Sequence, residues 1–140
     1  MYNINESNIG GGIIITKELS SQEKEKVEKF LCKMKNLLIS GEYTITVNEK
    51  NKRFDREYNV NDEKRKEILN SLTVDDCIQV DKNTNPNFPD SEIYVFLKKA
   101  TLIVYGENED VELYIKMYLQ NCGYYDMTIV ISFHKSKQYE

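Results

Sequence analysis

The sequence predicts an α+β protein in which two or three helices pack on one face of an antiparallel sheet. Segments 111–120 and 127–135 alternate apolar and polar residues, as half-buried strands do. Segment 20–41 instead repeats apolar residues at the spacing of an amphipathic helix. With the apolar segment 92–105, the two alternating segments make three successive strands, which favours a C-terminal three-strand antiparallel meander.

Residues 1–20 are interpreted as an N-terminal lead-in, and residues 21–140 as the main domain. Three glycines at 10–12 precede a β-branched run, Ile13–Thr16, which predicts a short strand after a flexible stretch. The glycines lack the lysine and hydroxyl residue of a phosphate-binding loop, and they lack the GxGxxG spacing. We therefore expect no ligand-binding role for this part of the chain.

The clearest helix begins after Ser20, which forms a capping-box pattern with Glu23. Gly41 is typical of the residue that follows a helix. The apolar residues between them fall on one buried stripe, formed by Val27, Phe30, Leu31, Met34, Leu37 and Leu38.

The middle of the chain predicts shorter elements. Residues 42–47 alternate like a strand or extended edge segment, and residues 48–58 are polar and basic enough for an exposed loop or hairpin. A second helix is expected from Asn61 to about Ser71. Thr73 can cap a third helix, because the acidic pair at 75–76 suits the positive end of a helix dipole.

The C-terminal half is rich in strands. Residues 81–90 contain both prolines and predict a loop, which leads into 92–105 as one long strand or two strands joined by a bulge. Residues 106–110 then turn the chain into segment 111–120. The link 121–126 is short enough to join this segment to 127–135 as a hairpin.

Composition describes a single globular domain of 140 residues, with 40% hydrophobic and 30% charged residues. No apolar run approaches the roughly 18 residues of a membrane span, and the first residues do not read as a secretory signal. Three cysteines without CxxC spacing argue against disulfides and a zinc site and favour a reducing cytoplasm. The net charge of -4 is unusual for a nucleic-acid binder, although segment 111–137 is locally basic.

The alternation places a group of polar residues on one face of the last two strands. The apolar side of the final strand is expected to hold Met127, Ile129, Ile131 and Phe133. The opposite face should be exposed and should bring together Tyr114, Lys116, Tyr118, Ser132 and His134, the only histidine of the chain.

This residue set suits RNA cleavage without a metal ion. Such cleavage needs a base for the 2′-hydroxyl, a cation for the charge on phosphorus and an acid for the leaving oxygen. Histidine can move protons near neutral pH, lysine supplies charge, and tyrosine donates a hydrogen bond or stacks on a base. One histidine without clustered carboxylates makes a poor metal site. The alternative is that His134 has no functional role and that the tyrosines only cover a face of the sheet.

Several segments resemble the MqsR-type toxins, a branch of the RelE-like ribonuclease toxins of bacterial toxin–antitoxin modules. The resemblance covers about Val27 to Lys137. It rests on KMKNLLISGEY (Lys33–Tyr43), ILNSLTVDDC (Ile68–Cys77), LYIKMYL (Leu113–Leu119) and TIVISFHKSK (Thr128–Lys137).

The resemblance implies a RelE-like α+β fold and an mRNA endoribonuclease that a cognate antitoxin neutralises. The family's strand tyrosine falls on Tyr114, with Lys116 two positions later, and its last-strand basic residue falls on His134. Two positions depart from the family pattern, because its lysine falls on Gln79 and its glutamine falls near Ser91.

The predicted catalytic residues are therefore His134 as acid or base, Tyr114 as its counterpart or as an orienting hydroxyl, and Lys116 as phosphate stabiliser. No metal, cofactor or membrane is expected, the partners are RNA and the antitoxin, and a homodimer is left open. The alternative function is a non-catalytic binding module, such as an inactive relative or a phage protein that captures a host partner. The residues expected to contact RNA are Lys98, Lys135, Tyr118 and Arg56.

Overall fold

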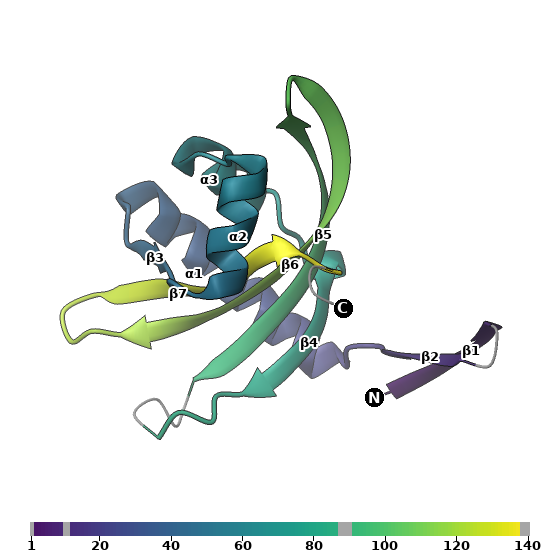
Figure 1. Ribbon diagram of the computed structural model, residues 1–140. Coiled ribbons are helices and arrows are strands. Elements are labelled where there is room, and N and C mark those ends of the chain that lie inside the picture. The colour runs from purple at the N-terminus through teal and green to yellow at the C-terminus, as the bar shows by residue number, and fades with distance from the viewer. Residues whose placement is uncertain (1, 10–11, 87–90, 138–140) are drawn as a thin grey trace.

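The computed structural model describes residues 2–9, 12–86 and 91–137, with side chains described from residue 18 onward (Figure 1). Within these residues the α+β class is confirmed, with three helices and a five-stranded sheet. The helices are α1 (Ser21–Ser40), α2 (Glu49–Tyr58) and α3 (Asp62–Asn70), and a 3-10 turn, η1, follows at Val74–Asp76. The strands of the main sheet are β3 (Tyr43–Ile45), β4 (Cys77–Lys82), β5 (Glu92–Val104), β6 (Glu107–Asn121) and β7 (Asp126–Lys135).

The main sheet has the order β3-β7-β6-β5-β4. The predicted meander of β5, β6 and β7 is confirmed as antiparallel, and β4 adds to it. The sheet is nevertheless mixed, because β3 pairs with β7 in parallel, which sequence alternation alone does not show. The predicted strand at 13–16 lies in β2 (Gly12–Lys17), which pairs with β1 (Tyr2–Ile9) in a separate two-stranded sheet.

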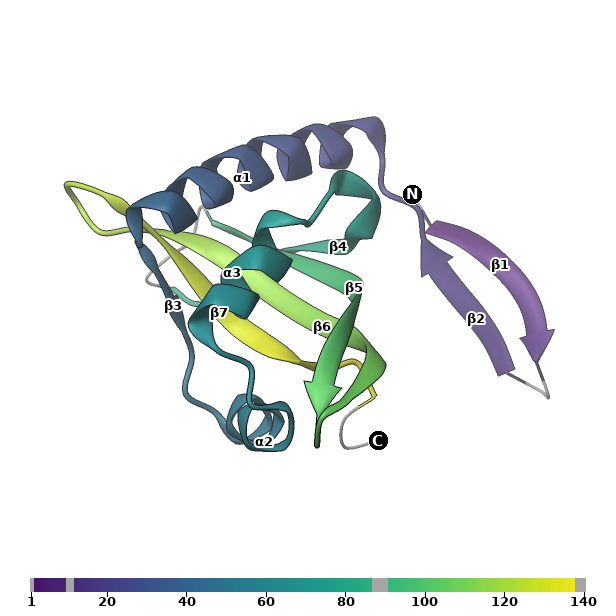
Figure 2. The same cartoon turned by 90° about the horizontal axis from the view of Figure 1, so that it is seen from above.

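The three helices share one face of the main sheet, as Figure 2 shows from above. Phe30 of α1 stacks on Tyr94 of β5, with 4.2 Å between ring centroids, and Phe54 of α2 meets Phe133 of β7 edge-on. Residues of β4, β5, β6 and β7 form the sheet side of this core, and Leu113 and Ile115 of β6 are fully enclosed. The α1 cap is formed as predicted, with Ser20 and Glu23 bonded to each other's backbone N–H.

The expectation of an exposed loop or hairpin at 48–58 is wrong, because this segment folds into α2. Asn48 caps the helix by accepting a hydrogen bond from the Asn51 N–H. The buried residues of α2 are Asn51, Phe54 and Tyr58, which follow helical spacing. Only two of them are aromatic and the segment is strongly charged, so the sequence pattern does not stand out as a helix. The third helix expected after Thr73 is likewise only the short turn η1.

The expected faces of the last strand are wrong over half of its length, because β7 contains a bulge at Ile131. Ser132 pairs with Lys116 but Val130 pairs with Met117, so one residue of β7 is extra. Before the bulge, Thr128 and Val130 face the core. After it, Phe133 faces the core, so His134 stays on the other face, as predicted.

The side chain of Asn51 ties α2 to this bulge. Its amide nitrogen donates to the carbonyls of Thr46 and Ile131, and its amide oxygen accepts from the Phe133 N–H, each at 2.9 Å. The amide nitrogen of Asn48 also donates to the Ile131 carbonyl, at 2.9 Å. Asn51 is only 3% exposed, so these bonds are shielded from water in the folded protein.

Asn51→Ala is therefore expected to lower the free energy of unfolding by about 2–4 kcal/mol, because the Phe133 N–H and the Thr46 carbonyl lose their side-chain partner, while the Ile131 carbonyl keeps only its bond from Asn48. Urea denaturation measures the change. The matched control is Lys52→Ala, at the next position of α2, where the side chain is exposed and the change should stay within about 0.5 kcal/mol. Equal effects of the two substitutions would show that the Asn51 bonds contribute nothing.

Candidate functional site

The sheet face opposite the helical layer carries the polar residues of β6. Tyr114, Lys116 and Tyr118 alternate with the core residues of this strand, and each is half-buried. On β7, His134 lies directly opposite Tyr114, and Ser132 lies opposite Lys116. Directly opposite residues of an antiparallel pair project to the same side, so these four side chains are neighbours.

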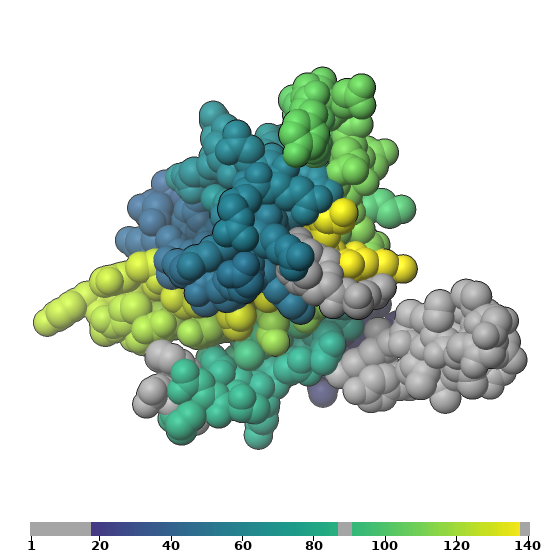
Figure 3. Space-filling model, in the orientation of Figure 1, coloured from purple at the N-terminus to yellow at the C-terminus, as the bar shows by residue number. Residues whose placement is uncertain are grey.

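The ring of His134 stacks on the ring of Tyr114, with 5.6 Å between centroids and 22° between planes. We expected an exposed histidine, and this is wrong, because only 6% of His134 is exposed. The alternation of the strand indicated neither that the ring would stack on Tyr114 nor that α2 would lie beside β7. This helix lies along the end of β7 (Figure 3), and its Lys50 shares a cavity with His134.

The hydrogen bonding of His134 indicates which ring nitrogen can act as a base. Its Nδ1 lies 2.9 Å from the carbonyl oxygen of Lys135, which can only accept, so Nδ1 carries the proton. In the neutral ring, Nε2 is then unprotonated. Within the described residues Nε2 has no hydrogen-bond partner, and it is not among the fully enclosed unpaired atoms.

The surroundings favour this neutral form. Burial lowers the pKa of His134 below its usual 6.5, and the positive charge of Lys50 lowers it further, while the bond to the Lys135 carbonyl acts in the opposite direction. Burial also raises the pKa of Tyr114, and the carboxylate of Asp81 adds to this effect. At neutral pH the site therefore holds a neutral imidazole and a protonated phenol.

These groups line an open cavity of about 320 Å³. No carboxylate occurs among its described lining residues, which carry two ammonium groups, three hydroxyls and the imidazole. The arrangement can accept a proton, donate hydrogen bonds and stabilise negative charge. The lining residues are Lys50, Tyr114, Lys116, Ser132, His134 and Ser136.

Three residues predicted to contact RNA lie away from this cavity. Lys98 lies opposite the core residue Leu113, so it projects to the helical side, where it pairs with Asp76 at 3.2 Å. Lys135 projects to the same side, over the ring of Tyr58. Arg56 is exposed on α2 and pairs with Glu49. Tyr118 shares the face of the cavity, two positions beyond Lys116.

The two positions that depart from the family pattern also have local partners. Gln79 donates to Asp81 at 2.7 Å, and Ser91 accepts from Asn83 at 2.8 Å.

Sequence reasoning missed Lys50, the one lining residue that a helix contributes. The signal for α2 was Asn48 as a cap, followed by the spacing of Asn51, Phe54 and Tyr58.

Neither a metal centre nor a membrane span is found in the described part of the chain. No three His, Cys, Asp or Glu side chains of residues 18–86 and 91–137 come together in a way that could hold a metal ion. None of the described helices is long and apolar enough to cross a membrane.

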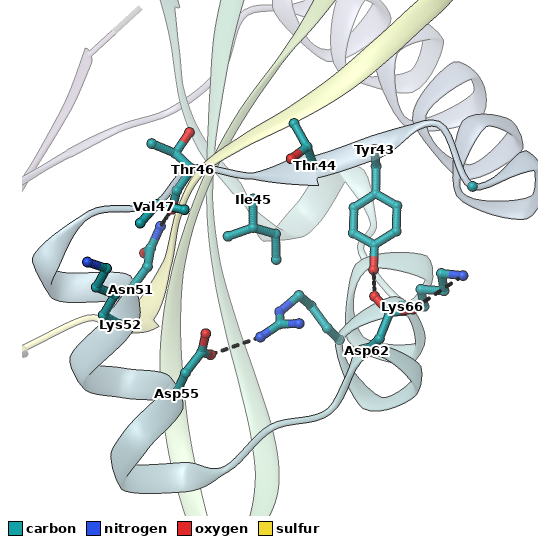
Figure 4. Close-up of a pocket in the computed structure, with 12 residues that line it drawn as sticks. Tyr43, Thr44, Ile45, Thr46, Val47, Asn51, Lys52, Asp55, Asp62 and Lys66 are labelled. Carbon is teal, nitrogen blue, oxygen red and sulfur yellow. Dashed lines mark hydrogen bonds and ion pairs between the residues drawn. The ribbon is translucent and has the colours of Figure 1, made fainter.

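A second, larger cleft of about 460 Å³ lies between β3, α2 and α3 (Figure 4). In Figure 4 the hydroxyl of Tyr43 points to Asp62, and Asp55 pairs with a guanidinium group from α3. That guanidinium belongs to Arg65, which lies 2.8 Å from Asp55. Burial and the Asp62 carboxylate raise the pKa of Tyr43 to about 12.

One wall of this cleft is the free edge of the sheet. Thr46 donates its N–H to Val130 of β7, and the Glu42 carbonyl accepts from Thr128. Backbone direction alternates along a strand, so the N–H and C=O groups of residues 43 and 45 point away from β7. Among the described residues these outward groups have no hydrogen-bond partner.

No protein-family model, curated protein or solved structure shows significant similarity to this chain. The resemblance to the MqsR-type toxins therefore stays a prediction.

Because His134 is buried in its neutral form, it should make stability depend on pH. Its contribution is complete above the unfolded-state pKa of about 6.5 and is lost as the pH falls toward the lower folded-state pKa. We expect the free energy of unfolding to fall between pH 7.5 and 5.5, and to fall less in His134→Gln. Urea denaturation across this range measures both slopes, and parallel curves would contradict the neutral, buried state.

Proposed function

We propose that the protein is an endoribonuclease that cleaves mRNA without a metal ion, at the cavity formed by Tyr114, Lys116 and His134. The observation that supports this most directly is the placement of a neutral histidine against a tyrosine in a cavity with two ammonium groups. These are the groups that a metal-free cleavage of a phosphodiester needs.

In the proposed reaction, Nε2 of His134 removes the proton of a ribose 2′-hydroxyl. The 2′-oxygen then forms a bond to the neighbouring phosphorus, and the bond from phosphorus to the 5′-oxygen breaks. Lys116 stabilises the charge on the phosphate oxygens. The leaving 5′-oxygen takes its proton from the phenol of Tyr114 or, where that phenol only donates a hydrogen bond to the phosphate, from water. The products are a 2′,3′-cyclic phosphate and a 5′-hydroxyl.

The resemblance to the MqsR-type toxins supports the same activity. On that basis we propose that a cognate antitoxin protein binds the enzyme and holds it inactive. Because the substrate is mRNA, the enzyme would act in the cytoplasm.

His134→Gln is expected to lower the cleavage rate by about 100-fold or more, because it removes the base. Tyr114→Phe and Lys116→Ala, which keep most of the packing, should each lower it as well. The rate should rise as the pH is raised through a pKa below 6.5 and then level off. A gel assay with a single-stranded RNA, in the presence of a chelator, measures these rates.

The control for this assay is Arg56→Ala, since Arg56 is exposed and does not line the cavity. Its rate should stay within about twofold of the unsubstituted protein. Circular dichroism and urea denaturation verify that each variant is folded. Full activity of His134→Gln, or loss of cleavage on chelation, would overturn the proposed mechanism.

The second candidate function is a non-catalytic binding module. The free edge of β3 favours it, because unpaired N–H and C=O groups beside a cleft can receive an extended segment of another protein as an additional strand. Val47, which lines this cleft, is 76% exposed, as expected for an apolar residue that contacts a partner.

Expression in a bacterial host separates the two functions. A nuclease should arrest growth with cut transcripts, and His134→Gln should relieve the arrest while Val47→Lys should not. For a binding module, Val47→Lys should relieve the growth arrest, His134→Gln should not, and the transcripts should stay intact. The reason is that a charged side chain at a sheet edge prevents strand addition. Ile39→Lys is the matched control, since Ile39 is exposed to a similar extent but lies on α1, outside the cleft lining.

A further inference from the structure

The cavity beside His134 contains a serine that has no role in the proposed reaction. Ser132 lies two positions before His134 on β7 and directly opposite Lys116 of β6. Both Ser132 and Lys116 line the cavity, and both are half-buried. Directly opposite residues of an antiparallel pair have Cβ atoms about 5 Å apart and project to the same side, so the hydroxyl and the ammonium group face one space.

The bulge at Ile131 brings Ser132 to this face of the sheet. Val130, just before the bulge, faces the core, and strict alternation would direct Ser132 to the core as well. The carbonyl of Ile131 belongs to the peptide bond that precedes Ser132. It accepts side-chain hydrogen bonds from Asn48 and Asn51, each at 2.9 Å, so the backbone at Ser132 is fixed on the cavity side.

The hydroxyl of Ser132 and the ammonium group of Lys116 have no hydrogen-bond or ion-pair partner among the described residues. The other serine of the lining differs, because Ser136 donates to Glu112 at 2.8 Å. The Ser132 oxygen is not among the fully enclosed unpaired atoms, so it is open to the cavity. Two donors without protein partners are therefore available to a ligand that enters this space.

The carboxylates nearest to these donors do not line the described cavity with Lys116. Glu112, on the same face of β6, is four residues from Lys116, which is about 14 Å along a strand. Asp81 accepts from Gln79, and β5 separates it from β6. An ammonium group beside a hydroxyl matches phosphate, whose oxygens carry negative charge and accept several hydrogen bonds.

Strand formation does not explain the serine. Within residues 127–133, Ser132 is the only one that is neither β-branched, aromatic nor methionine, although strands prefer β-branched and aromatic residues. A serine also occupies less of the cavity than those residues would. We propose that Ser132 and Lys116 together bind the RNA phosphate that is cleaved, with the Ser132 hydroxyl donating to a phosphate oxygen beside His134. The identity of the ligand as RNA rests on the proposed ribonuclease function, whereas binding of a phosphate requires no cleavage.

The only histidine of the chain provides a direct test, since its ring gives a single set of imidazole NMR signals. The first probe is a 2′-O-methyl dinucleotide, which has one phosphodiester and cannot be cleaved through its 2′-oxygen. The second probe is inorganic phosphate. Both should shift the His134 signals, and Ser132→Ala should weaken binding of both by about tenfold, because a hydrogen bond to a charged acceptor is lost. Lys116→Ala should weaken binding at least as much.

A matched pair of substitutions separates the hydroxyl from packing. Ser132→Thr and Ser132→Val introduce side chains of nearly the same shape, of which only the first keeps a hydroxyl. Ser132→Thr should therefore bind the dinucleotide about tenfold more tightly than Ser132→Val. The control is Thr101→Ala, since Thr101 is exposed on β5, outside the described lining, and donates to Asp110. It should bind as the unsubstituted protein does, and urea denaturation verifies that each variant keeps its fold.

The outcomes distinguish this inference from the proposed function. The inference is overturned if neither probe shifts the His134 signals, or if Ser132→Thr and Ser132→Val bind the dinucleotide equally. Binding of inorganic phosphate without binding of the dinucleotide overturns the assignment to RNA. If both probes bind in a Ser132-dependent way but no RNA is cleaved, the phosphate site stands and the ribonuclease function falls. If RNA is cleaved while Ser132→Ala changes neither binding nor rate, the ribonuclease function stands and this inference falls.

Discussion

The hydrogen bonds from the Asn51 side chain to β7 hold the helices, the sheet edge and the polar cavity in one arrangement. β3 ends at Ile45, so β7 continues without a neighbouring strand on that side. There the side-chain amide of Asn51 takes the place of a peptide group, accepting from the Phe133 N–H and donating to the Ile131 carbonyl. Because the Asn51 side chain supplies these hydrogen bonds, the chain can begin α2 beside β7 and does not need to continue β3.

The bulge at Ile131 determines which side chains of β7 face the core. Without it, period-two alternation would place His134 on the same face as Val130, which belongs to the core. The extra residue reverses the alternation, so that Val130 and Phe133 both face the helices while His134 faces Tyr114. The two asparagines that bond to the Ile131 carbonyl fix the bulge in place.

Local patterns were enough to predict α1 and residues 111–120 of β6, because Ser20 with Glu23 and the strict alternation around Ile115 each indicate a single structure. The turn expected at 106–110 is wrong, because β6 already begins at Glu107. The bulge was not predictable in this way, because residues 129–131 are all aliphatic and show no break in pattern. The pairing of β3 with β7 and the approach of Lys50 depend on contacts between distant segments. For Lys98 a signal existed, since it is in phase with the core residues Tyr94 and Phe96.

The long loop closed by Asn51 and Phe133 has a consequence for the synthesis of the protein. These residues are 82 positions apart, and a ribosome adding 5–20 residues per second needs roughly 4–16 s to pass from one to the other. Throughout that interval the nascent chain carries α2 and the β3 edge without the strand that anchors them. The cavity can assemble only after β7 has been synthesised, so a growing polypeptide that lacks β7 cannot bring Tyr114 and Lys116 together with His134.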